Sequence, residues 1–272
     1  MAIVTISRGT KSGGEALARC LAGRLGCSTL GREVAQEAAT QLGVPVRDLE
    51  ERLEEKPGII GRSSLLTRLY VAAVQNALVE DAASGSLVYH GLAGAHLLRG
   101  VPGVLSLRLI SPLQVRVRTL VETEEMDEAS AEAYIKDVDD ARARWVRAMY
   151  GLDIADPAQY DLVVNLERFS IPEVCEVLTS LLARPEFQMT SERLADLQDF
   201  RVQCQVRLAL LEDLGTQTLD LEAKVRRGSV EVTGQAPLLR DGDVGARISQ
   251  IVSEVPGVDE VHLRLEWFDP YP

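Results

Sequence analysis

The chain has 272 residues, of which 46% are hydrophobic and 26% are charged, and its formal net charge is −12. This length and composition can supply the cores of one large or two modest globular domains, which excludes disorder for most of the chain. The negative charge argues against a broad surface for nucleic acid or anionic membranes, because both would be repelled. We therefore expect a globular protein that does not bind nucleic acid.

The sequence also predicts a cytoplasmic protein without a transmembrane segment. Residues 1–9 have too few apolar residues for a signal peptide, and Arg68 interrupts the longest apolar stretch, Leu65–Val79. With three histidines and no C-x-x-C pair, we expect no metal site. In a cytoplasmic chain the four cysteines are expected to be reduced thiols, namely Cys20, Cys27, Cys175 and Cys204.

The first elements are a strand over residues 2–7, a glycine-rich loop and a helix that ends at Gly26. A phosphate-binding P-loop reads G-x-x-x-x-G-K-[ST], and Gly9 and Gly14 keep its glycine spacing. Glu15 and Ala16 stand where its lysine and hydroxyl would be. The loop is therefore either a phosphate cradle at a helix N-terminus or a ligand-free turn in which Glu15 satisfies the helix dipole.

Strands and helices alternate over the next part of the chain, which predicts an α/β domain with a parallel sheet flanked by helices. This domain should end near Pro185. Helices are expected over 32–42, 47–55, 63–83, 112–124, 130–150 and 171–183, and strands over 86–91, 103–110 and 160–166.

A different order of elements follows from Ser191. It consists of a helix to about residue 214, strands over 219–228 and 229–236, a helix over 241–255 and a strand over 258–267. The order α-β-β-α-β predicts a small α+β domain. We therefore expect two domains, at residues 1–185 and 191–268.

Three stretches of the first domain are VTISRGTKSGGEALA, LGREV and YIKDVDDARARWVRAMYGLDIADPAQYDLVVNLE. Together they resemble the cytidylate kinase-like family of P-loop nucleoside-monophosphate kinases, over about residues 2–183. The resemblance implies a P-loop kinase-like fold and transfer of phosphate from ATP to CMP or dCMP with Mg²⁺. The stretches RRGSVEVTGQA and VPGVDEVHLRL resemble a BON domain, which implies a protein, lipid or ligand partner for the second domain.

The resemblance and the loop pattern together indicate the residues of the site. Asp139 and Arg142 match the family's D-x-x-R and share a helix face by their spacing, although an exposed ion pair would give the same spacing. Arg116 and Arg32 either bind phosphate or form surface salt bridges. We expect donor phosphates to bind Arg8, Gly9, Thr10, Lys11, Ser12, Gly13 and Gly14, catalysis to use Lys11, Arg116 and Arg142, and the acceptor nucleotide to bind Arg32, Asp139 and Arg142.

Two positions depart from the family pattern. Glu15 places a carboxylate beside the loop, and Leu92 replaces an arginine in YHGLAGAHLL. Because phosphoryl transfer depends on positive charge, these departures favour a nucleotide-binding protein with weak or altered kinase activity. The alternative is an inactive nucleotide-sensing or scaffold protein that acts through its C-terminal domain. His90, His96 and Trp145 are expected to be structural.

Overall fold

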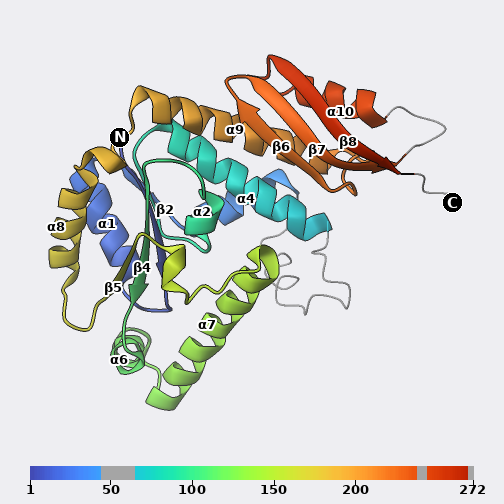
Figure 1. The fold of residues 1–272 in the computed structure, drawn as a ribbon. Coiled ribbons are helices and arrows are strands. Elements are labelled where there is room, and N and C mark those ends of the chain that lie inside the picture. Colours follow the sequence, from blue (N-terminus) through green and yellow to red (C-terminus); the bar gives the residue numbers. More distant parts are fainter. Residues whose placement is uncertain (44–64, 238–243, 269–272) are drawn as a thin grey trace. The chain divides into compact units, whose positions relative to one another are not determined.

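The computed structural model describes residues 1–43, 65–237 and 244–268. They form two compact units, each with its own sheet (Figure 1). Of the described residues, unit 1 contains 1–35 and 84–189, and unit 2 contains 36–43, 65–83, 190–237 and 244–268. The helix expected over 47–55 lies outside the described residues.

The sheet of unit 1 has five parallel strands in the order β2-β3-β1-β4-β5. The central strand β1 has Ile3, Val4 and Ile6 fully buried, as expected for a strand covered on both faces. The predicted parallel sheet is confirmed, with one further strand, β2, that is too short to show a pattern in the sequence. The strands are β1 (Ile3–Arg8), β2 (Ser28–Leu30), β3 (Leu87–Tyr89), β4 (Val104–Ile110) and β5 (Leu162–Asn165).

Two helices, α1 (Gly14–Leu25) and α8 (Ile171–Leu182), cover one face of this sheet, where Leu17 and Leu178 join Val4 and Leu107 in one core (Figure 1). The short helix α5 (Gly94–Leu97) contacts β1 and β4. Unit 1 also contains α6 (Leu113–Glu124), α7 (Glu128–Tyr150) and 3-10 turns at Pro157–Gln159 and Pro185–Phe187, whereas α2 (Arg32–Gln41) belongs to it only as far as residue 35. This packing fixes the start of α1 at the carboxyl end of β1.

The expectation that all four cysteines are reduced thiols is wrong, because α1 and α8 are joined by a disulfide. Cys20 of α1 and Cys175 of α8 form a disulfide, with their Cα atoms 6.3 Å apart. Cys27 and Cys204 are free. The two paired cysteines are 155 residues apart in the sequence, and only the shared sheet face brings them together.

Unit 2 has a three-stranded sheet in the order β6-β7-β8. The antiparallel strands β6 (Leu221–Arg226) and β7 (Ser229–Pro237) form a hairpin, and β8 (Glu260–Phe268) pairs with β7 in parallel. A core of apolar side chains joins this sheet to α9 (Ser191–Glu212) and α10 (Val244–Ser253). From α9 onward the order of elements is the predicted α-β-β-α-β.

The long helix α4 (Leu65–Ser84) lies almost wholly in unit 2. Its Glu80 accepts hydrogen bonds from Gln205 Nε2 at 2.6 Å and from Arg201 Nη1 at 3.2 Å, both on α9. The units separate between Met189 and Thr190, but α4 falls inside the first of the two domains expected from the sequence. The division at 1–185 and 191–268 therefore stays a prediction.

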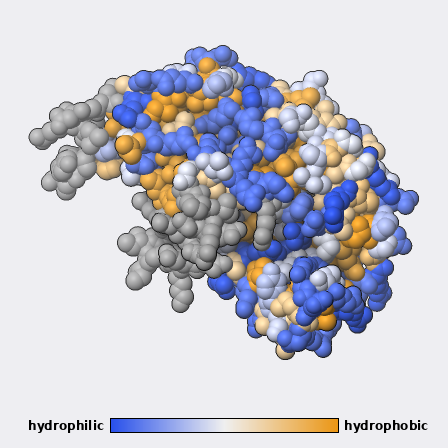
Figure 2. All heavy atoms as spheres, turned by 180° about the vertical axis from the view of Figure 1, so that it is seen from behind, coloured by the Kyte–Doolittle hydropathy of each residue, from blue (hydrophilic) through white to orange (hydrophobic). Residues whose placement is uncertain are grey.

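The surface agrees with a composition rich in charged residues. Figure 2 shows a face on which hydrophobic residues form patches separated by hydrophilic ones. Among the described residues, no helix has the length and apolarity required to cross a membrane.

Candidate active site

The glycine-rich loop connects β1 to α1 and has the backbone of an anion cradle. Gly13 has φ of 81°, a conformation that favours glycine, and it precedes α1 without any side-chain cap. The backbone N–H groups of Gly13 and Gly14 donate to no acceptor among the described residues. Uncapped N–H groups and the helix dipole make this helix start attractive for an anion.

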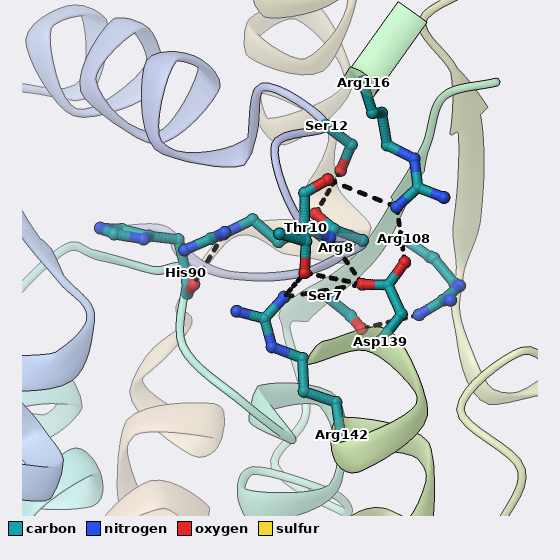
Figure 3. Close-up of polar contacts among 10 residues, drawn as sticks. Ser7, Arg8, Thr10, Ser12, His90, Arg108, Arg116, Asp139 and Arg142 are labelled. Atoms are coloured by element: carbon teal, nitrogen blue, oxygen red, sulfur yellow. Dashed lines mark hydrogen bonds and ion pairs between the residues drawn. The ribbon is translucent and has the colours of Figure 1, made fainter. Parts of the chain in front are cut away.

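A carboxylate from α7 binds the same loop (Figure 3). Asp139 Oδ1 accepts hydrogen bonds from both the backbone N–H and the hydroxyl of Thr10, each at 2.8 Å. Asp139 Oδ2 accepts from Arg116 Nη1 at 2.5 Å, and that nitrogen also donates to the Thr10 carbonyl at 3.3 Å. A side chain at Gly9 would lie 3.0 Å from Arg116 Nη1, so glycine leaves room for this arginine.

Arg142 completes the cluster from the next turn of α7. Its Nη1 donates to the hydroxyl of Thr10 at 3.1 Å and lies 4.0 Å from Asp139 Oδ1. The structure thus brings together Thr10, Arg116, Asp139 and Arg142, and it places the D-x-x-R pair in contact with the loop instead of in an isolated surface ion pair.

Burial opposes ionisation of Asp139, but hydrogen bonds from Arg116 and Thr10 outweigh it and lower the pKa of this carboxyl group. The side chains of Arg116 and Asp139 are 14% and 29% exposed, so their ion pair is only partly screened by water. The carboxylate is therefore charged at neutral pH and holds Arg116 against the loop.

Lys11 and Glu15 both form ion pairs with side chains outside the loop. Lys11 Nζ forms an ion pair with Glu124 of α6 at 2.8 Å. Glu15 is 63% exposed and lies 3.7 Å from Arg19, one turn further along α1. Glu15 therefore does not fill the loop, and in this structure Lys11 is engaged by a carboxylate. Arg32 begins α2, but its side chain is outside the described part of the chain.

Arg8 lies close to the start of α1 from the end of β1. A side chain at Gly14 would collide with Arg8, and Arg8 Nε donates to the carbonyl of His90 at 3.4 Å (Figure 3). Burial, followed by the positive charge of Arg8, lowers the pKa of His90. His90 is therefore neutral at pH 7 and carries no positive charge to the site.

Leu92, where the resemblance implies an arginine, has apolar surroundings. Leu92 packs in an apolar cluster with Val146 and Trp145 of α7. Its carbonyl accepts a hydrogen bond from the hydroxyl of Tyr89 at 3.1 Å. The buried His96 lies 5.4 Å from the ring of Tyr150, as expected for a structural histidine.

A further arginine near the loop was missed by the sequence interpretation. Arg108 of β4 donates from Nη1 to Ser7 Oγ at 3.1 Å, and its guanidinium lies 5.6 Å from the ring centre of Tyr160. The hydroxyl of Tyr160 also reaches Ser7 Oγ, at 3.2 Å. The signal was present in the sequence, because Arg108 interrupts the apolar strand VLSLRLI.

Magnesium must be considered for any kinase-like site. No group of three or more metal-ligating side chains occurs in the described residues. Ser12 Oγ donates to the carbonyl of Gly9 at 2.8 Å, and Asp139 is held by Arg116 and Thr10. The described residues therefore fit Mg²⁺ as an ion carried largely by nucleotide phosphates, which is a common way to bind it.

Comparison with known proteins identifies the family of this chain. A profile described as the cytidylate kinase-like family matches residues 3–168. The cytidylate kinase of Methanoculleus marisnigri is 28% identical over 66% of this chain and 93% of its own length. The cytidylate kinase of Methanothermobacter thermautotrophicus is 27% identical over 61% of this chain and 96% of its own.

A solved structure supports the fold alone. An uncharacterized protein from Eubacterium ventriosum superposes with a TM-score of 0.53 at 17% identity, over 66% of this chain and 97% of its own. The profile match covers more than half of the chain and includes both the loop and the D-x-x-R pair. The chain therefore belongs to the cytidylate kinase-like family.

Proposed function

We propose that unit 1 binds nucleotides and transfers a phosphoryl group from ATP to CMP or dCMP. The observation that carries this proposal is the convergence of Arg116 and Arg142 on the glycine-rich loop, with Asp139 holding them there. Phosphoryl transfer needs positioning and positive charge more than covalent chemistry. Two arginines beside an uncapped helix start supply both.

Each residue has a distinct role in this proposal. The N–H groups at the start of α1 bind donor phosphate, and Arg142 and Arg116 stabilise the charge of the phosphates. Asp139 fixes Arg116 and orients the acceptor nucleotide from the far side of the loop. Mg²⁺, carried on the ATP phosphates, would add further positive charge.

We expect a lower rate of phosphoryl transfer than in a family member with an arginine at the position of Leu92. Loss of an arginine that contacts the transferred group can cost roughly 10³-fold or more in rate. Glu15 carries no such penalty here, because its side chain points to Arg19 and solvent. We therefore expect weak or altered turnover caused by Leu92.

The test is chromatographic detection of nucleoside diphosphate after incubation of the full chain with Mg²⁺-ATP and each monophosphate in turn. Arg142→Ala should abolish the product, whereas Arg144→Ala, an exposed arginine two residues along α7, should not. No diphosphate with any acceptor would refute the kinase proposal. Retained nucleotide binding in that case would favour the sensing or scaffold function.

We further propose that the part of unit 2 from α9 to β8 is a BON-like module. Its order of elements and its hairpin at Arg227 and Gly228 support this assignment. The module contributes no residue to the site of unit 1 in this proposal, and its ligand is a separate question.

A further inference from the structure

Unit 2 contains a cavity of about 390 Å³ between α4, α9 and β6. Cavities that hold small molecules begin at about 300 Å³, so this one suits a small molecule and is too small for a folded partner. Every described residue that lines it belongs to unit 2. The cavity is therefore separate from the nucleotide site proposed for unit 1.

Two arginines in this cavity are held by neutral groups. Arg68 of α4 donates from Nη2 to the carbonyl of Leu219 at 3.0 Å and from Nη1 to that of Gln217 at 3.4 Å. Arg207 of α9 donates from Nη1 to Gln75 Oε1 at 3.3 Å. Neither arginine forms an ion pair with any residue in the described ranges, and the same holds for Lys224 of β6.

Neutral acceptors orient a guanidinium without cancelling its charge. This is unusual in a chain with 41 acidic and 29 basic residues, where carboxylates are plentiful. Arg68 is partly buried, where a charge without a counter-ion is costly, and an incoming oxyanion would relieve that cost. Asp220 and Glu222 also line the cavity but leave the positive side chains in excess, and they can accept hydrogen bonds from a hydroxyl or amine of the ligand.

The two arginines of the cavity are placed at different points along α4. Arg68 and Gln75 are seven residues apart, which puts them on the same helix face about 10 Å from each other. Arg207 contacts Gln75, whereas Arg68 contacts the carbonyl of Leu219, so the two guanidinium groups have different neighbours in the cavity. Leu210, Leu211 and Leu219 form an apolar wall. A ligand that fills this space has an anionic group and an apolar body.

The backbone of β6 forms part of the lining. Four consecutive residues of this strand, Leu221–Lys224, line the cavity. Because successive side chains point to opposite sides of a sheet, side chains alone cannot account for all four, and the backbone must contribute. Within the described sheet β6 is an edge strand, so one row of its N–H and C=O groups has no partner strand among the described residues. This edge can bind the polar groups of a planar ligand.

We propose that this cavity binds a small organic anion through a phosphate or carboxylate group, with Arg207 and Arg68 as the anion ligands and the free edge of β6 as a hydrogen-bonding side. Arginine suits both anions because its donors match two oxygens at once. The proposal does not depend on phosphoryl transfer in unit 1.

The test is titration of the isotopically labelled full chain, followed by backbone amide NMR. The probes are phenyl phosphate and benzoate, which share an apolar ring but differ in the anion, and inorganic phosphate, which lacks the ring. We expect saturable shifts at the amides of residues 221–224 with at least one ring-bearing probe, and weaker binding of inorganic phosphate. Binding to the loop of unit 1 would instead shift the amides of residues 9–14, which separates the two proposals.

Two matched variants decide the assignment. Arg207→Gln removes an exposed charge and should raise the dissociation constant at the β6 amides roughly tenfold. Arg226→Gln removes an exposed charge from β6 at a position outside the cavity and should leave the dissociation constant unchanged. Preference for phenyl phosphate or for benzoate identifies the anion. The absence of saturable shifts at residues 221–224 with both ring-bearing probes, or equal affinity in Arg207→Gln and wild type, would overturn the proposal.

Discussion

Replacement of Asp139 by asparagine tests whether this carboxylate stabilises unit 1 by holding Arg116 against the loop. Asparagine has nearly the same shape, and its Oδ1 can still accept both hydrogen bonds from Thr10. Its amide nitrogen would then face Arg116 Nη1, which is also a donor. The substitution therefore removes the ion pair and leaves the rest of the contact in place.

The size of the effect follows from this one contact. A hydrogen bond to a charged group contributes about 1.5–3 kcal/mol, and the partial exposure of both side chains places the loss at about 2 kcal/mol. For a unit of this size, that loss lowers the melting temperature by roughly 4–8 °C. Because the pKa of Asp139 is lowered on folding, its contribution is full above about pH 4 and disappears as the pH falls through the folded value.

The assay is thermal and urea unfolding of the wild type, Asp139→Asn and Asp140→Asn. Asp140 is exposed and its side chain forms no ion pair or hydrogen bond with a described residue, so its substitution is the same chemical change one position later. We expect Asp140→Asn to match the wild type, and the deficit of Asp139→Asn to become smaller below about pH 4. Equal stability of the two variants would refute the inference that the Asp139–Arg116 pair holds the loop.

Three further predictions concern Glu15, His90 and the cysteines. Glu15→Gln should change the affinity for ATP by less than about threefold, because Glu15 is exposed and paired with Arg19; tenfold tighter binding in a fluorescent-nucleotide titration would show that Glu15 repels phosphate. His90 should titrate by NMR below about 6.5, so that stability falls as the pH drops through this range, and a higher midpoint would contradict its burial. Alkylation of the unfolded chain without reductant should label two of the four cysteines, and labelling of all four would exclude the disulfide.

The local parts of the site could be predicted from the sequence because they depend on neighbours in the chain. The strand, the loop from Gly9 to Gly14 and the helix after it follow from apolar spacing and glycine positions, and the structure has them at these places. The shared helix face of Asp139 and Arg142 follows from their spacing alone. Each of these inferences needs only a few residues of context.

The partners across the fold could not be predicted, because they depend on tertiary packing. Thr10 and Asp139 are 129 residues apart, and no pattern in the sequence joins them. The same is true of the association of α4 with unit 2. Its buried apolar residues, such as Tyr70, Ala73 and Leu78, are spread around the helix, so the hydrophobic pattern alone does not indicate its neighbours.

An acidic chain can still have a site for phosphate, because the repulsion from its overall charge and the attraction of a few nearby arginines act over different distances. The charge of −12 is spread over the chain, and salt screens exposed charges beyond about 8–10 Å. At the loop itself, Arg116 and Arg142 lie beside the carboxylate of Asp139, and Arg8 lies at the start of α1. A phosphate that reaches the start of α1 therefore meets a locally positive site, whereas a long polyanion would also meet the acidic surface around it. This difference explains why the sequence argues against nucleic acid as a partner and yet allows a nucleotide.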